Sequence, residues 1–407
     1  MVKPQRHPRT GGGPVLVLDP IIRHQIGAVR GLGRAGWDVV VAGHERHADA
    51  LAARSRYASP PYEHLPDPYG DPAVFEAALD RIVRRRGCQA IVAGSDSTIA
   101  RLQSIDVAVP TVPPVHASLD RIIDKVHLAA SCRAAEVPYP ATWLPDQPAP
   151  AGAGWPRIVK PRRSSMVRPG KVVGRTGAFV VGDPAEEDAA VAILRSLGLE
   201  PIIQVRVERA YPVSVAIVRH RGSSSFRIAY RVLLEYPPQG GQAAAIVSID
   251  PHRGIGARAL EIAERACDAA GYEGLANVQL YGQEDGSICL IEVNSRVYGS
   301  VWFPERLGLR PVERAVLAAL GEDPPPPIDY PLGRRFHRPI LEARWLMASR
   351  DDRGPAWRLP AILRPWDVFD VLSVSDPLPF AAGLWHVLAR SFEELNGPWP
   401  PSSRPPS

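Results

Sequence analysis

Short apolar runs alternate with amphipathic stretches over the first 115 residues of the chain. Three runs have the length of buried strands, and two stretches repeat apolar side chains at the helical period; Asp71 is well suited to cap the second helix. The strand runs are Val15–Leu18, Trp37–Ala42 and Gln89–Ala93, and the helical stretches lead up to Arg34 and cover Asp71–Arg86. Strands that alternate with helices predict a parallel, Rossmann-like sheet. We therefore expect an N-terminal domain over residues 14–117, after a flexible arm at residues 1–13.

One glycine pattern in this region resembles a dinucleotide fingerprint but has the wrong context. Residues 31–36 read GLGRAG, which matches G-x-G-x-x-G. The fingerprint must follow a strand and open a helix. Here it closes a helix and precedes a strand. We interpret it as a helix C-terminal turn, and we interpret His24, His44, His47 and His64 as surface or capping residues.

The pattern changes after residue 117. Ser118 is expected to cap a helix with apolar residues at 119, 122, 123 and 126, from which Lys125 projects. A connector rich in Pro, Ala and Gly follows at 145–156. Strand patterns then dominate until a helix at about 256–270, and they cover 157–160, 171–181, 201–207, 213–219 and 226–234. The EDPPPP segment ends this region, so we predict a domain over 118–323, a Trp-rich extension over 324–396 and a Pro/Ser tail over 397–407.

Residues 276–296 read as a β-hairpin with one apolar and one polar face. Asp285-Gly286 is the dipeptide that best fits a two-residue turn. That turn places Gln279 opposite Glu292 and Asn277 opposite Asn294, with Tyr281 and Leu290 completing the polar face. The opposite face would bury Ala276, Val278, Leu280, Cys289, Ile291 and Val293. Oxygen ligands with few carboxylates suit Mg²⁺; an edge hairpin with a solvated polar face is the alternative.

Lysine is scarce in this chain. Of 48 basic residues only four are lysine, Lys3, Lys125, Lys160 and Lys171. Lys160 ends an apolar run, as a residue at a strand end would. Because a lysine ammonium contacts phosphate as a point charge and Mg²⁺ bridges phosphates, three clustered lysines upstream of the hairpin indicate a nucleoside triphosphate site.

Composition narrows the class of protein. The 407 residues allow two or three domains, and 45% are hydrophobic. A net charge of +5 with dispersed basic residues argues against a nucleic-acid surface and is compatible with anionic substrates. The four cysteines show no metal-type spacing and are expected to be reduced core thiols. No apolar run is long enough for a membrane span, and the N-terminus lacks the apolar region of a secretory signal, so we expect a cytoplasmic protein that does not contact membranes.

Five motifs in order resemble the ATP-grasp superfamily, and most closely its carboxylate–amine ligases, similar to carbamoyl phosphate synthase-like and biotin carboxylase-like chains. The motifs are Ile122–Lys125, Val137–Pro140, Ile158–Pro161, Ile202–Gln204 and Leu290–Arg296. The resemblance covers roughly residues 14 to 320. It implies a Rossmann-like domain followed by a two-subdomain ATP-grasp fold, a mixture of α/β and α+β structure.

The resemblance also implies roles for individual residues. Lys125 and Lys160 would contact ATP phosphates, with Lys171 nearby, and Gln204, Val205 and Val207 would belong to the segment that meets adenine. Gln279, Glu292 and Asn294 would hold Mg²⁺, and Arg296 would stabilise the transferring phosphate. Two features depart from the family: the loop at 161–170 is basic rather than glycine-rich, and the first metal position is Gln279 rather than an acid. We expect the loop to be mobile without ligand and Arg162 and Arg163 to act in turnover.

These expectations define an ATP- and Mg²⁺-dependent ligase that joins a small-molecule carboxylate to an amine. Two alternatives stay open. One is a nucleotide-binding regulatory or scaffold protein without turnover, and the other is acyl- or carbamoyl-phosphate formation with a different nucleophile. Neither substrate can be named from the residues, and a homodimer is left open.

Overall fold

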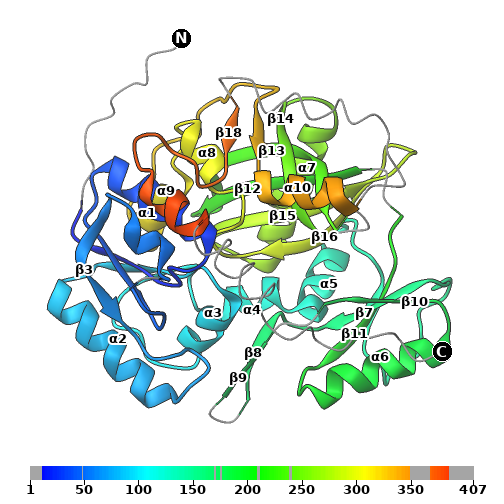
Figure 1. Cartoon of the computed structure of the whole chain (residues 1–407). Coiled ribbons are helices and arrows are strands. Elements are labelled where there is room, and N and C mark those ends of the chain that lie inside the picture. Colours follow the sequence, from blue (N-terminus) through cyan, green and yellow to red (C-terminus); the bar gives the residue numbers. More distant parts are fainter. Residues whose placement is uncertain are drawn as a thin grey trace.

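The computed structural model describes residues 12–47, 49–168, 171–174, 177–208, 211–237, 241–348 and 367–384, except for the side chains of 168, 171–174, 347 and 348. Three sheets and one separate hairpin make up this part of the chain. Figure 1 shows the N-terminal sheet in blue on one side, a small subdomain with helix α6 on the other, and hairpin β8–β9 between them.

The N-terminal domain is a five-stranded parallel sheet in the order β3-β2-β1-β4-β5. Its strands and helices alternate along the chain, so the predicted Rossmann-like domain is confirmed. The elements are β1 (Val15–Val17), α1 (Arg23–Ala35), β2 (Val39–Gly43), the 3-10 helix η1 (Leu51–Arg54), β3 (Ala58–His64), α2 (Pro72–Arg86), β4 (Ala90–Val92), α3 (Asp96–Leu102) and β5 (Thr111–Val112).

The GLGRAG segment closes helix α1, as predicted. Gly36 adopts a left-handed φ of 97°, and its N–H donates to the carbonyls of Gly33 and Leu32. Glycine adopts this conformation without a Cβ clash, which is why helices commonly end on it. The segment is therefore a helix terminus and not a nucleotide-binding loop.

The small subdomain is a four-stranded sheet covered by one helix. The strand order is β10-β7-β11-β6, and α6 packs on β7, β10 and β11. The elements are β6 (Thr142–Trp143), β7 (Arg157–Pro161), β10 (Phe179–Val181), α6 (Pro184–Ser196) and β11 (Pro201–Val205). The strand predicted over 171–181 is wrong as one element: β8 (Ser165–Arg168) and β9 (Lys171–Gly174) pair only with each other, whereas β10 joins the larger sheet.

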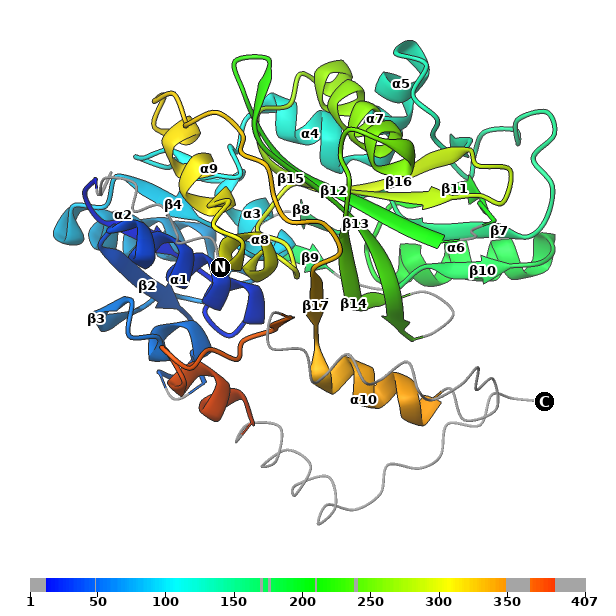
Figure 2. The same ribbon diagram turned by 90° about the horizontal axis from the view of Figure 1, so that it is seen from above.

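The largest layer is a seven-stranded sheet in the order β16-β15-β12-β13-β14-β17-β18. Figure 2 shows α7 and α10 on opposite sides of this sheet, and α10 contacts β13 and β14. The elements are β12 (Tyr211–His220), β13 (Ser223–Tyr236), β14 (Gln242–Ile249), α7 (Gly254–Ala270), β15 (Gly274–Gly282), β16 (Ile288–Asn294), α8 (Trp302–Arg306), α9 (Pro311–Ala319), β17 (Arg335–His337), α10 (Pro339–Ala348) and β18 (Val368–Phe369).

Two helices, not one, follow the N-terminal domain. They are α4 (Ala117–Ile123) and α5 (Lys125–Ala134), and Asp124 separates them with non-helical φ and ψ of −82° and 112°. The Asp124 carboxylate caps α5 by accepting from the N–H groups of Val126 and His127. The predicted cap at Ser118 is wrong, because Ser118 lies inside α4 and its hydroxyl bonds His116 Nδ1. Lys125 consequently opens a helix instead of projecting from the end of one.

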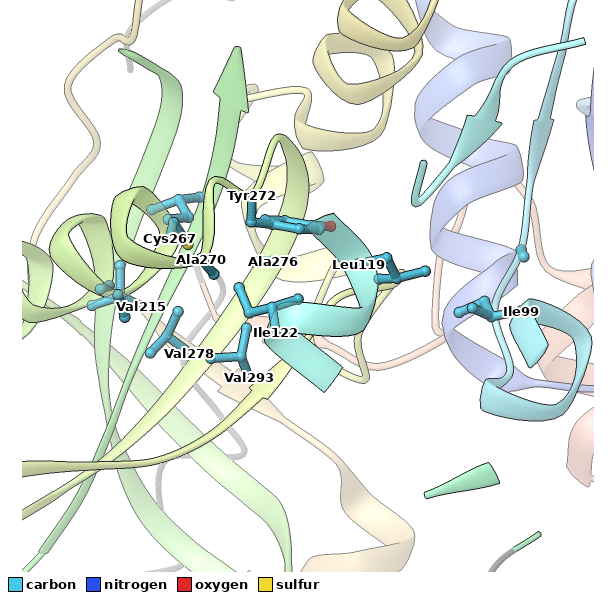
Figure 3. Packing of buried hydrophobic residues seen from close by; sticks show 14 of the residues in the cluster. Ile99, Leu119, Ile122, Val215, Cys267, Ala270, Tyr272, Ala276, Val278 and Val293 are labelled. Atoms are coloured by element: carbon cyan, nitrogen blue, oxygen red, sulfur yellow. The ribbon is translucent and has the colours of Figure 1, made fainter. Parts of the chain in front are cut away.

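One of the three apolar clusters in the described residues joins α4, α5 and α7 to the large sheet. Leu119 and Ile122 of α4 pack with Val278 and Val293 of the sheet and with Tyr272 (Figure 3). These side chains are fully or almost fully buried. All four cysteines are buried and free, so the predicted core thiols are confirmed.

The C-terminal segment is tied to both neighbouring layers. β17 and β18, which lie within the predicted Trp-rich extension, form one edge of the seven-stranded sheet. Farther along, Asp376 accepts a 2.8 Å hydrogen bond from Arg30 Nε of helix α1, and it also bonds Ser55. Four of the five tryptophans at this end, Trp357, Trp366, Trp385 and Trp399, fall outside the described residues. None of the described helices is both long and apolar enough to cross a membrane.

Candidate active site

Three of the predicted site residues, Lys125, Glu292 and Asn294, line one pocket. The pocket is lined by side chains from the N-terminal domain, from the start of α5, from the segment before β8 and from β16. Its polar members include Asp96, Lys125, Arg163, Ser165, Glu292 and Asn294. The lysine and the hairpin residues are more than 160 positions apart in the chain, so the fold brings together groups that the sequence only suggested.

The hairpin pairs the expected residues. Gln279 lies opposite Glu292, and Asn277 lies opposite Asn294, so the predicted register at the polar end of the hairpin is confirmed. Asn277 is buried and donates to the hydroxyl of Tyr230 at 2.5 Å. Gln279 is exposed, and the side chains of Glu292 and Asn294 are partly buried.

The observed hairpin differs from the prediction in two ways, and their effects on the strand register cancel at Gln279 and Glu292. The turn is one residue longer than expected: Gln283 N–H donates to the Ser287 carbonyl, and Gly286 in the loop has a left-handed φ of 81°. A β-bulge at Ile291 then restores the register, because Leu280 pairs with Leu290 while Gln279 pairs with Glu292.

Because of the bulge, residues of β16 lie on different faces of the sheet from those predicted. Leu290, expected on the polar face, is completely buried in the core beside Leu280 and Ile288. Tyr281 pairs with Cys289 instead of with Leu290. Because side chains alternate along a strand, one extra residue moves every position on one side of it to the opposite face.

Lys125 and Lys160 approach the hairpin from two different elements. Lys125 is buried, and its Nζ donates to the Arg162 carbonyl at 3.4 Å. Lys160 lies in β7, where its neighbour Val159 faces the small core below the sheet. Burial and, to a smaller extent, the ammonium of Lys125 lower the pKa of Lys160, and the Glu292 carboxylate opposes both effects; the resulting pKa is about 8. The charges of Lys125 and Glu292 therefore both act on Lys160.

Neither Lys160 nor Glu292 is neutralised by direct contact. Among the residues that the structure describes, no hydrogen bond or ion pair engages the Lys160 ammonium or the Glu292 carboxylate. Partly buried charged groups are normally paired, because the loss of hydration is costly. An unpaired lysine and an unpaired carboxylate that lie close enough for their charges to interact indicate a site for a charged ligand.

The predicted adenine-contacting segment lies at the end of the small subdomain. Gln204 is buried in β11, and its amide donates to Thr142 Oγ at 2.8 Å, while Val205 packs on the small core. Val207 follows the strand and is partly buried. Lys171 begins β9 opposite Arg168, but its side chain lies outside the described part of the chain.

The basic segment before β8 is held by acidic side chains. Arg162 Nε donates to Asp124 at 2.8 Å, and Arg163 bonds both Asp124, at 3.1 Å, and Asp120, at 2.9 Å. Burial alone would raise the pKa of Asp124, but the bonds and charge of Arg162, followed by the charge of Arg163, outweigh it and lower that pKa. The two guanidinium groups thus contact the junction of α4 and α5. Residues 169 and 170 at the tip of the hairpin are not described.

Arg296 connects the hairpin to the N-terminal domain. Its Nε donates to Asp96 Oδ1 at 2.8 Å, and its Nη2 donates to Asn294 Oδ1 at 3.2 Å. Burial alone would lower the pKa of Arg296, but the carboxylate of Asp96 outweighs it and raises the pKa above its usual range. Arg296 therefore stays a cation beside the predicted metal position.

Sequence reasoning missed the groups that the N-terminal domain contributes. Asp96 starts α3, and His24 lies in the first turn of α1, with its Nε2 2.9 Å from the Gly94 carbonyl oxygen. Burial and, to a smaller extent, the charge of Arg296 lower the pKa of His24 to about 3, so this imidazole is neutral at physiological pH. The surface or capping role expected for His24 is wrong. The sequence signal for His24 is its position after the predicted strand Val15–Leu18, because parallel sheets bind ligands beyond the carboxyl ends of their strands.

Comparison with solved structures shows which fold this is. An ADP complex of N5-carboxyaminoimidazole synthetase from Staphylococcus aureus matches with a TM-score of 0.60 at 14% sequence identity, over 79% of this chain and 80% of that one. L-amino acid ligase from Bacillus licheniformis matches with a TM-score of 0.56 at 14% identity, over 76% and 75%. Biotin carboxylase from Campylobacter jejuni, in a βγ-ATP complex, matches with a TM-score of 0.59 at 17% identity, over 79% and 74%.

The chain has the ATP-grasp fold. The predicted Rossmann-like domain followed by two ATP-grasp subdomains is thereby confirmed, as is the resemblance stated from the motifs, at the level of fold. A scan of family models finds no match, and a search of curated proteins by sequence finds no relative. The residues themselves must therefore carry any conclusion about activity.

Proposed function

We propose that this protein is an ATP- and Mg²⁺-dependent ligase that activates a small-molecule carboxylate as an acyl phosphate and joins it to an amine. One observation carries the proposal. Lys125 and Glu292 line one pocket, and the charges of both act on Lys160; within the described part of the chain neither Lys160 nor Glu292 contacts a counter-ion. A nucleoside triphosphate with its metal would pair both charges, since its phosphates are anionic and Mg²⁺ is a cation.

The nucleotide would lie between the small subdomain and the hairpin. Lys125 and Lys160 would contact its phosphates, Gln204, Val205 and Val207 would line the adenine side, and Lys171 would add a cation from hairpin β8–β9. The low pKa of Lys160 is consistent with this role, because an ammonium disfavoured by burial gains most from an anionic ligand.

The residues on the polar face of the hairpin fit a hard cation. Gln279, Glu292 and Asn294 offer oxygen ligands from adjacent strands, and Glu292 is the single carboxylate among them. No cluster of three His, Cys, Asp or Glu side chains suited to a metal occurs in the described residues. With one charged ligand, metal would bind weakly until phosphate oxygens complete its shell, and it would then neutralise phosphate charge.

The chemistry follows from how the chain positions charge. The substrate carboxylate oxygen attacks the γ-phosphorus of ATP, and the bond to the β–γ bridging oxygen breaks, which gives ADP and an acyl phosphate. Arg296 is placed to stabilise the negative charge on the transferred group, because Asp96 fixes the guanidinium and keeps it charged. An amine then attacks the acyl carbon and phosphate leaves, forming the amide. The protein acts mainly by positioning and charge neutralisation.

The matched structures agree with this assignment in the ligands and names that they carry. One is a complex with ADP, another is a complex with a βγ-ATP ligand, and a third is an amino acid ligase. At 14–17% identity these names describe those proteins. They support the choice of ATP, a carboxylate and an amine as the first substrates to test.

A second candidate is a nucleotide-binding regulatory protein without turnover. The observation that favours it is the pairing of Arg162 and Arg163 with Asp124 and Asp120 at the junction of α4 and α5, which already neutralises these guanidinium groups. Replacing both arginines by alanine separates the two functions. A ligase should lose amide formation well beyond any loss of ATP binding, whereas a binding protein shows only the change in binding.

A screen for ADP release tests the proposal. Wild-type protein and Lys160→Ala are incubated with ATP, Mg²⁺ and pooled carboxylic acids, with and without pooled amines. We expect release from the wild type that needs an acid and yields amide only with an amine. Release that needs an acid and another nucleophile would instead identify a different acyl transfer. Binding of ATP without release in any pool would support the regulatory alternative.

A further inference from the structure

We infer that Asp19 is a positioning residue for Arg296, acting through the loop between β4 and α3; this inference rests on the proposed ligase function. Asp19 follows β1 in the N-terminal domain and Arg296 follows β16 in the large sheet. The connection between them consists of hydrogen bonds, all of which involve described residues.

The first link is an unusual backbone at Asp19. Its φ is 57°, in the left-handed region that side chains other than Asn, Asp and Gly rarely adopt. Residues held in this conformation concentrate at functional sites, where the surrounding contacts compensate for the strain. Here the compensation comes from the carboxylate of the same residue.

The second link is the set of hydrogen bonds that the Asp19 carboxylate accepts from the β4–α3 loop and the first turn of α3. Oδ2 accepts from the N–H groups of Gly94 and Ser95, at 2.8 and 2.9 Å. Oδ1 accepts from Ser95 Oγ at 2.9 Å and Thr98 Oγ at 2.5 Å. Ser95 in turn caps α3, because its hydroxyl accepts from the Thr98 N–H at 3.0 Å. One side chain thus fixes both the loop and the first turn of the helix.

The loop is also confined from its other side. Gln25 is completely buried and donates to the carbonyl groups that end β1 and β4, those of Leu18 and Val92. A Cβ at position 94 would lie 2.6 Å from Gln25 Cδ, so a larger residue there would displace the Gln25 side chain. The loop therefore has little freedom once Asp19 is in place.

The third link connects the β4–α3 loop to Arg296 in the proposed active site. Asp96 is the residue after Ser95, and its carboxylate bonds Arg296 Nε at 2.8 Å. Arg296 then donates to Asn294, one of the proposed metal ligands. A shift of the loop would move Asp96, and with it the guanidinium that faces the transferred phosphate. Displacements of about 1 Å from distant changes can cost catalysis about 100-fold.

The test compares Asp19→Ala with Asp19→Asn. Asparagine tolerates the left-handed backbone and keeps an oxygen for the Gly94 and Ser95 N–H groups, whereas alanine keeps neither advantage. We expect Asp19→Ala to lower kcat by about 10- to 100-fold, the range typical of residues that orient a functional group. The KM for ATP should change by less than about 3-fold, and Asp19→Asn should restore most of the rate. Asp38→Ala, which removes a carboxylate bonded to Ser59 in the same domain, is the control and should leave kcat unchanged.

Crystal structures of the wild type and both variants give a readout that does not depend on turnover. Asp19→Ala should lengthen the Arg296–Asp96 contact, and Asp19→Asn should keep it. An unchanged contact in Asp19→Ala, or a kcat within about 2-fold of wild type, would overturn the inference. If the wild type releases no ADP, the ligase proposal fails, yet the crystal structures still decide the positioning role. Thr98→Val removes one Asp19 contact without the backbone change and serves if Asp19→Ala does not fold; a lengthened contact would support the inference and an unchanged one would contradict it.

Discussion

Arg296 and Asp96 stand 200 positions apart in the chain, and their side chains meet at 2.8 Å across the boundary between the N-terminal domain and the large sheet. The Rossmann-like domain is thus part of the proposed active site and not only a neighbour of it. It supplies the carboxylate that orients the one arginine to which we assign charge stabilisation.

Asp96→Ala should therefore lower kcat more than it affects nucleotide affinity. The guanidinium would keep its charge but lose its orientation, and we expect a loss of about 100-fold, comparable to the removal of one transition-state contact. Asp96→Asn, which keeps an acceptor, should lose less. Steady-state kinetics with ATP as the varied substrate distinguishes the two effects; a large rise in KM at unchanged kcat would contradict this role.

Lys160 should make ATP binding pH-dependent. Its pKa of about 8 means that the ligand-free protein loses this ammonium as the pH rises through 8, and phosphate binding should raise the pKa again. ATP affinity should fall above pH 8, and binding at pH 8 should take up a fraction of a proton. Calorimetry in buffers of different ionisation enthalpy measures that uptake.

Lys160→Arg is the matched control, because arginine remains charged throughout this range. It should remove the proton uptake whatever its effect on affinity. Uptake that persists in Lys160→Arg would show that another group titrates on binding.

Glu292→Gln should remove the Mg²⁺ dependence of turnover while leaving the fold intact. The change keeps the shape of the side chain and removes the single charged ligand of the proposed metal set. We expect activity to fall at least about 100-fold and the thermal midpoint to shift little. Glu284→Gln, at the exposed turn of the same hairpin, controls for surface charge and should behave as wild type.

Glu305 should make the protein less stable as the pH rises. Burial raises its pKa, the hydrogen bond from the Val312 N–H opposes this, and the nearby Glu313 raises the pKa again; the resulting pKa is about 8. The folded state therefore holds a proton that the unfolded state releases above about 4.5, so the stabilising proton is fully present below that pH and is lost as the pH rises through 8. The free energy of unfolding should decrease by up to about 1.4 kcal/mol per pH unit in this interval.

Glu305→Gln keeps an oxygen that can accept from Val312 and carries no ionisable proton. Its stability relative to wild type should grow between pH 5 and pH 8, as measured by urea unfolding at each pH. A constant difference across that range would show that Glu305 does not titrate there.

The hairpin illustrates what could be predicted from sequence. Alternation of polar and apolar residues at 276–296 was enough to pair Gln279 with Glu292, yet the turn length and the bulge at Ile291 were both missed. Their effects on the register cancel at Gln279 and Glu292, where the predicted pairing is right. They do not cancel between the turn and the bulge, so the prediction places Leu290 on the wrong face. A bulge has no compositional signature of its own, because it depends on how the strand fits its neighbours.

The boundary between α4 and α5 could have been predicted from the sequence. Asp124 directly before Lys125 is a good N-cap, and the capping preference was applied to Ser118 instead. The contacts of Asp19, His24 and Asp96 were of a different kind. They depend on which loops a parallel sheet brings to one edge, and local pattern carries no information about such long-range neighbours.

Transfer of oxygen-18 is the most direct test of ligation through an acyl phosphate. A carboxylate substrate found in the screen is labelled with ¹⁸O at both oxygens and converted with ATP and the amine, and the released phosphate is examined by mass spectrometry. Attack of the carboxylate on the γ-phosphate predicts one ¹⁸O atom in each phosphate. Phosphate that forms at the same rate without any ¹⁸O would contradict it, since the carboxylate would then never have bonded to phosphorus.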